Sequence, residues 1–424
     1  MGAIFVETTA DRGIFAAMLT IGLLREGKVP RDSRVALTPA QVAALAAAHP
    51  EITFLVQPAD FRCYADQEYR DAGIQVQEDV SACDVLLGVK EVPVGQLIGG
   101  KTYFIFSHTI KKQPHNRELL RAVLDKKVRL IDWETLTDEQ GRRVIAFGRW
   151  AGIVGGHNAL WTWGVRSDAY RLPRAYECKD FEALKQTYAG IKLPAFKILL
   201  AGGGRVAQGT EEVLQAAGVL KISPEQFLAT GKPEQAVYTS LDCPDFYRRK
   251  DDQPFDWQHF FKHPAEYESA FAPYRKATDL FINAIYWDPA APRFFDKADM
   301  LKPDFRIRVI ADITCDINGS VPSTVKSTTI AEPLFGTDLV TGGMTGQLFG
   351  GQILTTMSID NLPNELPRDA SQAFGAQFSE QVWPELLKPE DSRMLAKACL
   401  ARDGELNEPF LYLADYVGGH TQKH

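Results

Sequence analysis

Short apolar runs alternate with longer amphipathic stretches along the chain from residue 20 onward. Such runs are typical of strands buried on both faces of a parallel sheet, and apolar residues at helical spacing between them predict crossover helices. The alternation therefore predicts an α/β protein with mainly parallel sheets. In the first part of the chain, the pattern predicts strands at 21–25, 53–57, 85–89, 103–107 and 128–131, and a helix at 38–48. Residues 1–18 show no clear pattern, and we expect a loosely docked arm there.

The same alternation resumes in the second part of the chain after a helical stretch. The segment between residues 219 and 276 is too long and too charged for a simple crossover, so we expect an insertion with a short helix near 266–274. The other elements predicted here are strands at 198–200, 220–223, 280–286 and 307–313, a helix or helix pair at 150–170 with a weak point at Gly155-Gly156, and an amphipathic helix at 371–387.

The length of 424 residues exceeds that of one ordinary domain. We predict two Rossmann-like parallel-sheet domains with an interdomain cleft. The first comprises residues 19–150 and about 365–424, because the last amphipathic helix returns to it. The second is a dinucleotide-binding domain over 151–364 that carries the insertion at 219–276.

Composition narrows the class of protein. A formal net charge of -7 argues against nucleic acid as a partner. The longest apolar run, Gly13 to Leu24, is too short to span a membrane and lacks the basic leader and cleavage site of a signal peptide. The six cysteines are scattered without a CxxC pair, which indicates reduced thiols in a cytoplasmic protein.

The clearest candidate for chemistry is the glycine turn in KILLAGGGRVAQGTEEVLQAAG, residues 197–218. A strand, the pattern Gly202-x-Gly204-x-x-Ala207 and a helix follow one another, as in the alanine variant of the dinucleotide fingerprint. Glycines let a pyrophosphate approach the backbone, and the helix N-terminus offers unpaired N–H groups. A strand-turn-helix unit without a nucleotide is the alternative. A phosphate-loop NTPase is disfavoured because no Lys follows the glycines.

The selectivity of this turn for NAD or NADP stays open. The acidic residue that binds the adenosine ribose is expected about 20 positions after the glycines, at the end of the second strand. In this sequence Ser223 ends the stretch read as that strand. Arg205, inside the turn, is a candidate for binding either a pyrophosphate or a 2′-phosphate.

Polar residues follow three apolar runs of the first domain. Lys90-Glu91 follows the run at 85–89, His108 follows 103–107, and Asp132-Trp133-Glu134 follows 128–131. In a parallel sheet the carboxyl ends of neighbouring strands share one edge, where ligands bind. We therefore expect a Lys, a His and carboxylates to lie at one edge of this sheet, although each could also be an ordinary solvated or hydrogen-bonded residue.

Two further features were considered for binding. Arg142-Arg143 precedes an apolar turn and can bind a carboxylate or phosphate bidentately, although paired arginines are usually surface charge. His259 and His263 have helical spacing but lack the Glu of a zinc protease motif, and no other spacing suggests a metal.

Seven short motifs are distinctive in combination, whereas each motif alone is not. They are RVALTP (34–39), GVKEVP (88–93), FSH (106–108), GRR (141–143), INAIYW (282–287), ADITCD (311–316) and SIDNLP (358–363). Taken together, these motifs make the chain resemble the lysine-forming saccharopine dehydrogenases and the lysine-ketoglutarate reductase half of aminoadipic semialdehyde synthases. More distantly, the chain is similar to alanine dehydrogenase and the N-terminal part of transhydrogenase.

The resemblance implies roles for individual residues. Lys90 and His108 would form the acid/base pair, with Glu91 and Glu134 in support. Four residues would line the amino-acid pocket: Arg34, Gln113, Arg143 and Phe147. By the resemblance, the contacts to NAD(H) or NADP(H) would come from Arg142, Gly204, Arg205, Tyr286, Ile313 and Asp360. We add to the predicted cofactor site Gly202 and Ala207 of the fingerprint, Leu362, and Ser223, which stands where the resemblance would lead us to expect an acid.

The reaction implied by the resemblance joins L-lysine and 2-oxoglutarate as an imine and reduces the imine to saccharopine, reversibly. A His suits the proton transfers near neutral pH, whereas a Lys does so only if its pKa is lowered. The roles of Lys90 and His108 are exchangeable at this stage. An alanine-dehydrogenase-like enzyme and a non-catalytic nucleotide-binding module are the alternatives, and a homo-oligomer is compatible with either.

Overall fold

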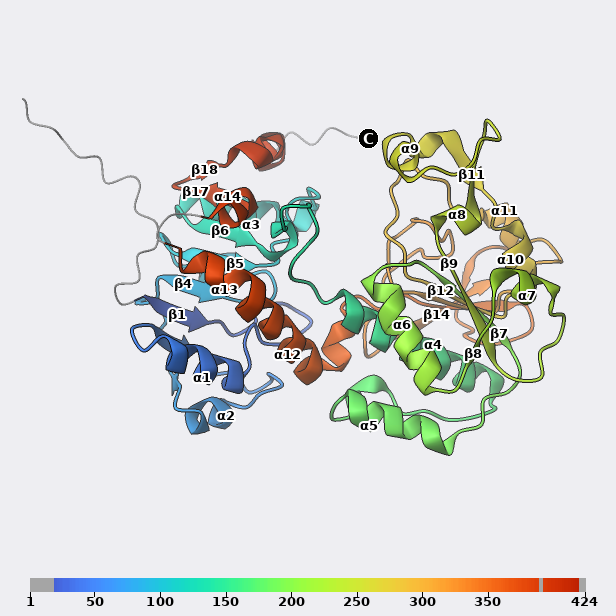
Figure 1. Cartoon of the computed structure of the whole chain (residues 1–424), viewed down its shortest axis with the longest axis horizontal. Coiled ribbons are helices and arrows are strands. Elements are labelled where there is room, and N and C mark those ends of the chain that lie inside the picture. The colour runs from blue at the N-terminus through green and yellow to red at the C-terminus, as the bar shows by residue number, and fades with distance from the viewer. Residues whose placement is uncertain (1–18, 389–391, 419–424) are drawn as a thin grey trace, which may run out of the picture. The chain divides into compact units, whose positions relative to one another are not determined.

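The computed structural model describes residues 19–388 and 392–418 (Figure 1). They divide into two compact units. The first unit holds the described residues up to Ala146 and from Pro367 onward, and the second holds Phe147–Leu366. The expected arm at 1–18 lies outside the described residues, and a cleft between the units stays a prediction.

The first unit is built on a sheet of eight strands among its described residues, in the order β18-β17-β6-β5-β4-β1-β2-β3. Strands β1 to β6 pair with one another in parallel, which confirms the prediction from the alternating pattern. The strands are β1 (Thr20–Leu23), β2 (Thr53–Val56), β3 (Gln75–Val76), β4 (Val85–Leu87), β5 (Thr102–Ile105), β6 (Arg129–Asp132), β17 (Cys399–Arg402) and β18 (Glu405–Leu406).

The pair β17 and β18 was not predicted from the apolar pattern. It forms a hairpin that adds antiparallel to β6 and so extends the first sheet with a segment from the end of the chain. Asp403 and Gly404, both at positive φ, make the turn. An Asp-Gly pair between short apolar runs is a hairpin signal, so this element was accessible from the sequence.

The helices of the first unit include two whose boundaries follow directly from the sequence. Thr38 caps the first one in a capping box with Gln41, as its position before Pro39 predicts. The predicted helix at 371–387 is α12, which continues through a π-helical turn at Phe378–Val382 into α13. The helices are α1 (Pro39–Ala48), α2 (Asp66–Asp71), α3 (Arg117–Asp125), α12 (Pro367–Gln377), α13 (Trp383–Leu386), α14 (Arg393–Ala398) and α15 (Ala414–Gly418).

The second unit, all of which is described, has its own eight-stranded sheet in the order β15-β14-β16-β13-β12-β7-β9-β8. The six strands from β16 to β8 are parallel to their neighbours, and β14 and β15 extend the β16 edge antiparallel. The strands of the sheet are β7 (Lys197–Ala201), β8 (Leu220–Lys221), β9 (Val237–Leu241), β12 (Leu280–Asn283), β13 (Val309–Asp312), β14 (Leu334–Asp338), β15 (Met344–Thr345) and β16 (Ile353–Met357).

Residues 219–276 hold more than the expected insertion, because β9 is a strand of the sheet and pairs with both β7 and β8. The part that lies outside the large sheet is a separate antiparallel pair, β10 (Tyr247–Arg249) and β11 (Tyr267–Ser269), with α9 between its strands. The helices of this unit are α4 (Gly148–Ser167), α5 (Phe181–Gln186), α6 (Arg205–Ala216), α7 (Pro224–Ala229), α8 (Cys243–Phe246), α9 (Trp257–Lys262), α10 (Ala272–Ala277) and α11 (Lys297–Met300).

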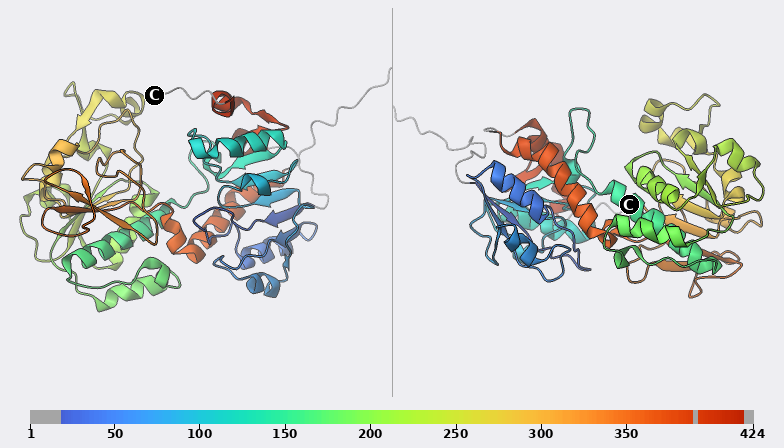
Figure 2. Two further views of the ribbon diagram at one scale, coloured as in Figure 1. Left: turned by 180° about the vertical axis from the view of Figure 1, so that it is seen from behind. Right: turned by 60° about the horizontal axis from the view of Figure 1, so that its bottom comes forward.

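The first helix of this unit, α4, is continuous, so the weak point expected at Gly155-Gly156 is wrong. Its glycines serve close packing instead. A Cβ at Gly152 would lie 1.9 Å from the carbonyl oxygen of Val206, and one at Gly155 would lie 2.6 Å from Ile313 Cδ1. The bare backbone therefore lets α4 press against α6, and the two helices lie side by side in the views of Figures 1 and 2.

Candidate functional site

The polar residues that follow three strands of the first unit lie at one edge of its sheet. Strands β4, β5 and β6 are parallel neighbours, so their carboxyl ends point the same way. Lys90 follows β4, His108 follows β5, and Asp132 ends β6. The structure therefore brings together the Lys, the His and the carboxylates that the sequence placed at one edge.

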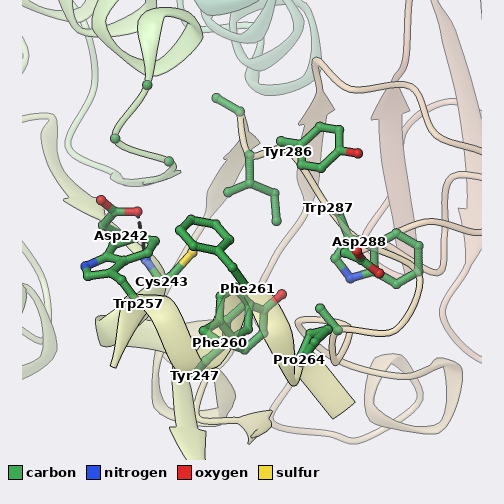
Figure 3. A pocket seen from close by; sticks show the side chains of 16 residues that line it. Asp242, Cys243, Tyr247, Trp257, Phe260, Phe261, Pro264, Tyr286, Trp287 and Asp288 are labelled. Carbon is green, nitrogen blue, oxygen red and sulfur yellow. Dashed lines mark hydrogen bonds between the residues drawn. The ribbon is translucent and has the colours of Figure 1, made fainter. Parts of the chain in front are cut away.

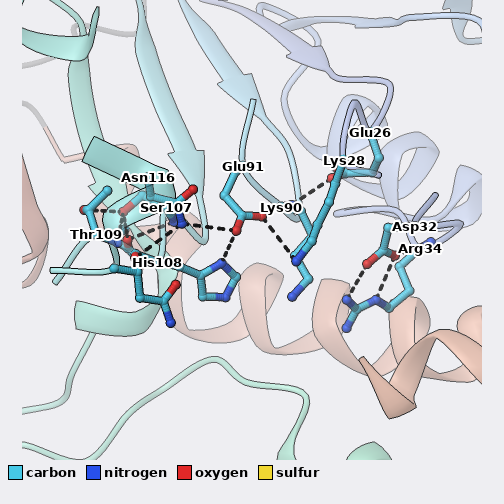
Figure 4. A network of polar contacts seen from close by, with 12 residues as sticks. Glu26, Lys28, Asp32, Arg34, Lys90, Glu91, Ser107, His108, Thr109 and Asn116 are labelled. Atoms are coloured by element: carbon cyan, nitrogen blue, oxygen red, sulfur yellow. Dashed lines mark hydrogen bonds and ion pairs between the residues drawn. The ribbon is translucent and has the colours of Figure 1, made fainter. Parts of the chain in front are cut away.

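The imidazole of His108 is paired with Glu91. Its Nδ1 lies 2.7 Å from Glu91 Oε1, while the Lys28 ammonium lies 3.7 Å from the other carboxylate oxygen (Figure 4). Burial of Glu91 acts to raise the pKa of its carboxyl, but the bond to His108 and the nearby charges outweigh it and lower that pKa to about 2. An ionised Glu91 thus holds Nδ1 as a donor and leaves Nε2 of His108 for proton exchange.

Lys90 is half-buried, and the positive charges of Arg34 and Lys28 act on its ammonium. Desolvation, followed by the charges of Arg34 and Lys28, lowers its pKa to about 8, against the opposing effects of Asp32 and Glu91. A lysine with this pKa is near the range in which general bases operate at neutral pH. The pKa of Lys90 is therefore lowered, as its expected role in proton transfer requires.

A second set of hydrogen bonds holds the backbone around His108. His108 itself has φ of 49°, a left-handed conformation that is uncommon for a non-glycine residue. The buried carboxylate of Asp132 accepts hydrogen bonds from the amide and the hydroxyl of Ser107, and the Ser107 hydroxyl also contacts Thr109 Oγ1 at 2.8 Å. These bonds stabilise the strained turn that presents the imidazole.

The residues expected in the amino-acid pocket have different surroundings. Arg34 is buried and makes a bidentate pair with Asp32, at 3.0 and 2.6 Å. Arg143 has Glu134 at 3.9 Å, and its guanidinium lies over the Phe106 ring. Gln113 directly precedes a 3₁₀ turn and accepts a hydrogen bond from Tyr416 on its carbonyl.

Two further residues were predicted for the site, Phe147 and Arg142. Phe147 belongs to the second unit, where it precedes α4. Arg142 is exposed in a turn and is paired with Asp138 at 2.8 Å. Their roles in binding stay predictions.

The glycine turn of the second unit opens onto a cavity of about 300 Å³. Gly202 has φ of 127°, and Gly204 is the N-cap residue of α6, as the fingerprint predicts. Aromatic side chains from the loop after β12 and from α9 line the rest of the cavity (Figure 3). The lining includes Tyr247, Trp257, Phe260, Phe261, Tyr286 and Trp287.

This cavity fits the group that the fingerprint implies. Gly203 and Gly204 are exposed at its edge, and no heavy atom outside the turn lies within 4 Å of a Cβ built on Gly204, so bare backbone faces open space there. A phosphate can therefore approach the N-terminus of the 12-residue helix α6. The aromatic lining offers flat apolar surface of the kind that an adenine ring requires.

The acidic residue missing from the expected position is supplied by a different strand. The predicted strand at 220–223 exists as the short β8, but it does not pair with β7, because β9 lies between β7 and β8. Ser223 instead caps α7. Asp242 directly follows β9 and lines the cavity, and a Cβ on Gly203 would lie 2.6 Å from its Oδ2. Asp242 therefore stands beside the glycine turn, where a ribose-binding acid belongs.

The other residues expected to bind cofactor lie partly at the surface and partly in the core of the second unit. Tyr286 lines the cavity and is 85% exposed, and Arg205 begins α6. The buried residues are part of the core: Ala207 is buried in α6, and Ile313 and Leu362 both pack against Gly155. Asp360 is exposed and follows β16 after a short loop.

The described residues hold neither a cluster suited to a metal ion nor a helix suited to spanning a membrane. No group of three or more His, Cys, Asp or Glu side chains among them is arranged to hold a metal ion. None of the described helices combines the length and apolar character needed to cross a bilayer.

Comparison with known proteins shows which fold the chain has and which families it is similar to. Residues 22–154 match the family model "Alanine dehydrogenase/PNT, N-terminal domain". A solved L-alanine dehydrogenase has a TM-score of 0.57 and 17% identity, over 95% of this chain and 99% of that one, which shows a shared fold.

Curated sequences give closer matches. The mouse mitochondrial alpha-aminoadipic semialdehyde synthase is 31% identical over 85% of this chain and 44% of its own length. This chain thus spans less than half of that relative. The Neurospora crassa saccharopine dehydrogenase [NAD(+), L-lysine-forming] is 28% identical over 88% of this chain and 92% of its own length.

The two parallel-dominant sheets and the solved structure show that the chain has the fold of alanine dehydrogenase, and the family model covers residues 22–154 of it. Over at least 85% of its length, the chain is similar to alpha-aminoadipic semialdehyde synthases and to lysine-forming saccharopine dehydrogenases.

Proposed function

We propose that this chain catalyses the reversible NAD(P)-dependent condensation of L-lysine with 2-oxoglutarate to saccharopine. The observation that carries the proposal is the proton-transfer pair at one sheet edge, Lys90 with its lowered pKa and His108 oriented by Glu91. Relatives that match over nearly their whole length are named for the same reaction.

The second unit would hold the dinucleotide through the glycine turn, Asp242 and the aromatic cavity. When bound, the nicotinamide supplies the hydride that reduces the imine carbon. The proposal requires that the nicotinamide end reach a substrate held by the first unit during turnover.

Lys90 takes the proton that the ε-ammonium of the substrate lysine must lose before it attacks the keto carbon of 2-oxoglutarate. A base with a pKa of about 8 can accept this proton and release it again near neutral pH. The neutral amine then forms a C–N bond to the keto carbon as the C=O π bond breaks, and one proton passes from the nitrogen to the keto oxygen, which becomes a hydroxyl.

His108 delivers a proton to that hydroxyl, which leaves as water and gives the protonated imine. Glu91 at 2.7 Å from Nδ1 orients the ring, so that Nε2 is the proton donor. The arginines at this edge suit substrates with several carboxylates. Arg143 is half-buried with Glu134 at 3.9 Å, and a planar guanidinium can bind a carboxylate bidentately.

Steady-state oxidation of NADH and NADPH tests the proposal. We expect turnover with lysine plus 2-oxoglutarate and much less with pyruvate plus ammonia. Turnover with the second pair alone would instead assign an alanine-dehydrogenase-like activity. Cofactor binding without turnover in either mixture would identify a non-catalytic nucleotide-binding protein.

The position of Asp242 further leads us to propose a preference for NAD(H). A carboxylate beside the glycine turn binds the ribose hydroxyls and repels a 2′-phosphate. Replacing Asp242 with Ser is expected to lower kcat/KM for NADH by about 10- to 100-fold, the loss expected for a hydrogen bond to a charged group. Asp288→Ser, which alters the opposite side of the same cavity, is the matched control (Figure 3). A wild-type preference for NADPH would contradict this assignment.

A further inference from the structure

The carboxylate of Glu26, which was not predicted from the sequence as a site residue, accepts hydrogen bonds from the backbone at Lys90. Glu26 lies in the loop after β1, and its two oxygens accept hydrogen bonds from two successive amides. Oε1 accepts from the Val89 amide at 2.6 Å, and Oε2 accepts from the Lys90 amide at 2.8 Å. Figure 4 shows Glu26 beside the loop that carries Lys90.

These two hydrogen bonds lie just past the point where the pairing of β1 with β4 ends. The last ladder bonds between β1 and β4 include Leu24 N to the Leu87 carbonyl, at 2.9 Å. Past this point the strands no longer pair, so the amides of Val89 and Lys90 have no strand partner on the β1 side. Glu26 supplies both acceptors with one side chain, in place of the two carbonyls of a continued strand.

The same peptide is tied to the other reacting group. The Val89 carbonyl accepts a hydrogen bond from the Phe106 amide at 3.0 Å, and Phe106 lies two residues before His108. A chain of hydrogen bonds therefore runs from Glu26 through Val89 to the segment that carries His108. A shift of the Glu26 carboxylate would be transmitted to both members of the pair.

The charge on Glu26 has its own surroundings. Burial and then the repulsion of Asp32 raise the pKa of Glu26 to about 7, against the two backbone hydrogen bonds and Arg34, which lower it. Asp32 and Arg34, from the segment that follows Glu26, are the charged groups that act on its carboxyl, and Lys28 and Glu91 act with them on the neighbouring Lys90. The carboxylate accepts both amides fully only when it is ionised.

We propose that Glu26 is a positioning residue for the reaction: its ionised carboxylate fixes the Val89-Lys90 backbone and so holds the Lys90 ammonium at the sheet edge, without touching the substrate. This inference rests on the proposed function for the role of Lys90. Its structural part, the grip on two amides, can be tested separately.

The test compares Glu26→Gln with the wild-type chain. A Gln has one acceptor oxygen, and its NH₂ group faces an amide that also donates, so one hydrogen bond is lost. We expect kcat to fall by about 10- to 100-fold, the loss of one charge-assisted hydrogen bond, while the Kd for NADH stays unchanged. Glu78→Gln, which removes an exposed carboxylate paired with Arg25 in the same unit, is the control.

Two readouts separate this role from a general loss of stability and do not depend on the substrate. Hydrogen exchange of the peptide that contains Val89 and Lys90 should become at least about tenfold faster in Glu26→Gln, with the rest of the first unit unchanged. The pH dependence of Lys90 acetylation, followed by mass spectrometry, should change its midpoint in Glu26→Gln and not in Glu78→Gln. Glu26→Asp keeps the charge and should retain more activity than Glu26→Gln.

Several results would overturn the inference. Wild-type kcat in Glu26→Gln, or faster exchange spread over the whole first unit, would each do so. If wild-type protein lacked turnover with lysine and 2-oxoglutarate, the proposed function would fail, whereas the local exchange and acetylation readouts would still decide the grip on Lys90.

Discussion

Replacing Lys90 with Met and His108 with Gln in one chain is expected to lower kcat for saccharopine formation by at least about 10³-fold, since each general acid/base contributes about 10²–10⁴-fold. Both substitutions remove a proton carrier from the same sheet edge and keep a side chain of similar size. The Kd for NADH should stay within about twofold of the wild-type value, because the glycine turn and its cavity belong to the second unit. Single-turnover kinetics and calorimetric titration with NADH measure the two quantities. Near-normal turnover in the double variant would remove both residues from the mechanism.

The pH profile separates the two residues. The pKa of Lys90 is lowered from 10.5 to about 8, so the fraction of neutral Lys90 rises as the pH rises through about 8. If neutral Lys90 accepts the proton from the substrate amine, kcat/KM for condensation should rise over the same interval. This rising limb should be absent in Lys90→Met and present in His108→Gln. A limb that disappears only with His108 would exchange the two assignments.

The sheet edge with Lys90 and His108 was predictable because it depends only on local signals. Apolar runs predict strands, alternation with helices predicts a parallel sheet, and the residue after each run must lie at its carboxyl edge. The structure adds the interactions that tune these residues. The bond between His108 and Glu91 spans 17 positions, and the left-handed turn at His108 is not visible in an apolar pattern.

Asp242 and Glu26 are two candidate site residues that the sequence alone did not predict. Asp242 was missed because the order of strands in a sheet depends on which crossover is made, and β9 inserts between β7 and β8. Glu26 was missed because its partners are backbone amides 63 and 64 positions away, and any loop carboxylate looks the same in sequence. In both cases the residue acts through a contact between neighbouring strands, which only the three-dimensional register reveals.

The glycine turn allows a matched pair of substitutions that distinguishes cofactor binding from folding. Gly204 has φ of -85°, and a Cβ there meets no heavy atom within 4 Å. Gly204→Ala is therefore expected to leave the free energy of unfolding within about 0.5 kcal/mol of wild type, as for substitutions without a new clash. The added methyl group occupies the space through which a pyrophosphate approaches the backbone. The Kd for NADH should then rise by about tenfold or more, equivalent to losing about 1.4 kcal/mol of binding.

Gly202→Ala is expected to act in the opposite way, on the fold. Gly202 has φ of 127°, and a Cβ there would lie 2.7 Å from the backbone oxygen of Ala284. The strained backbone alone costs about 1–3 kcal/mol, so the free energy of unfolding should fall by at least that amount. Urea unfolding and calorimetric titration with NADH, applied to both variants, measure the two effects. Equal losses of stability in the two variants, or unchanged NADH affinity in Gly204→Ala, would show that the turn does not bind the pyrophosphate through its bare backbone.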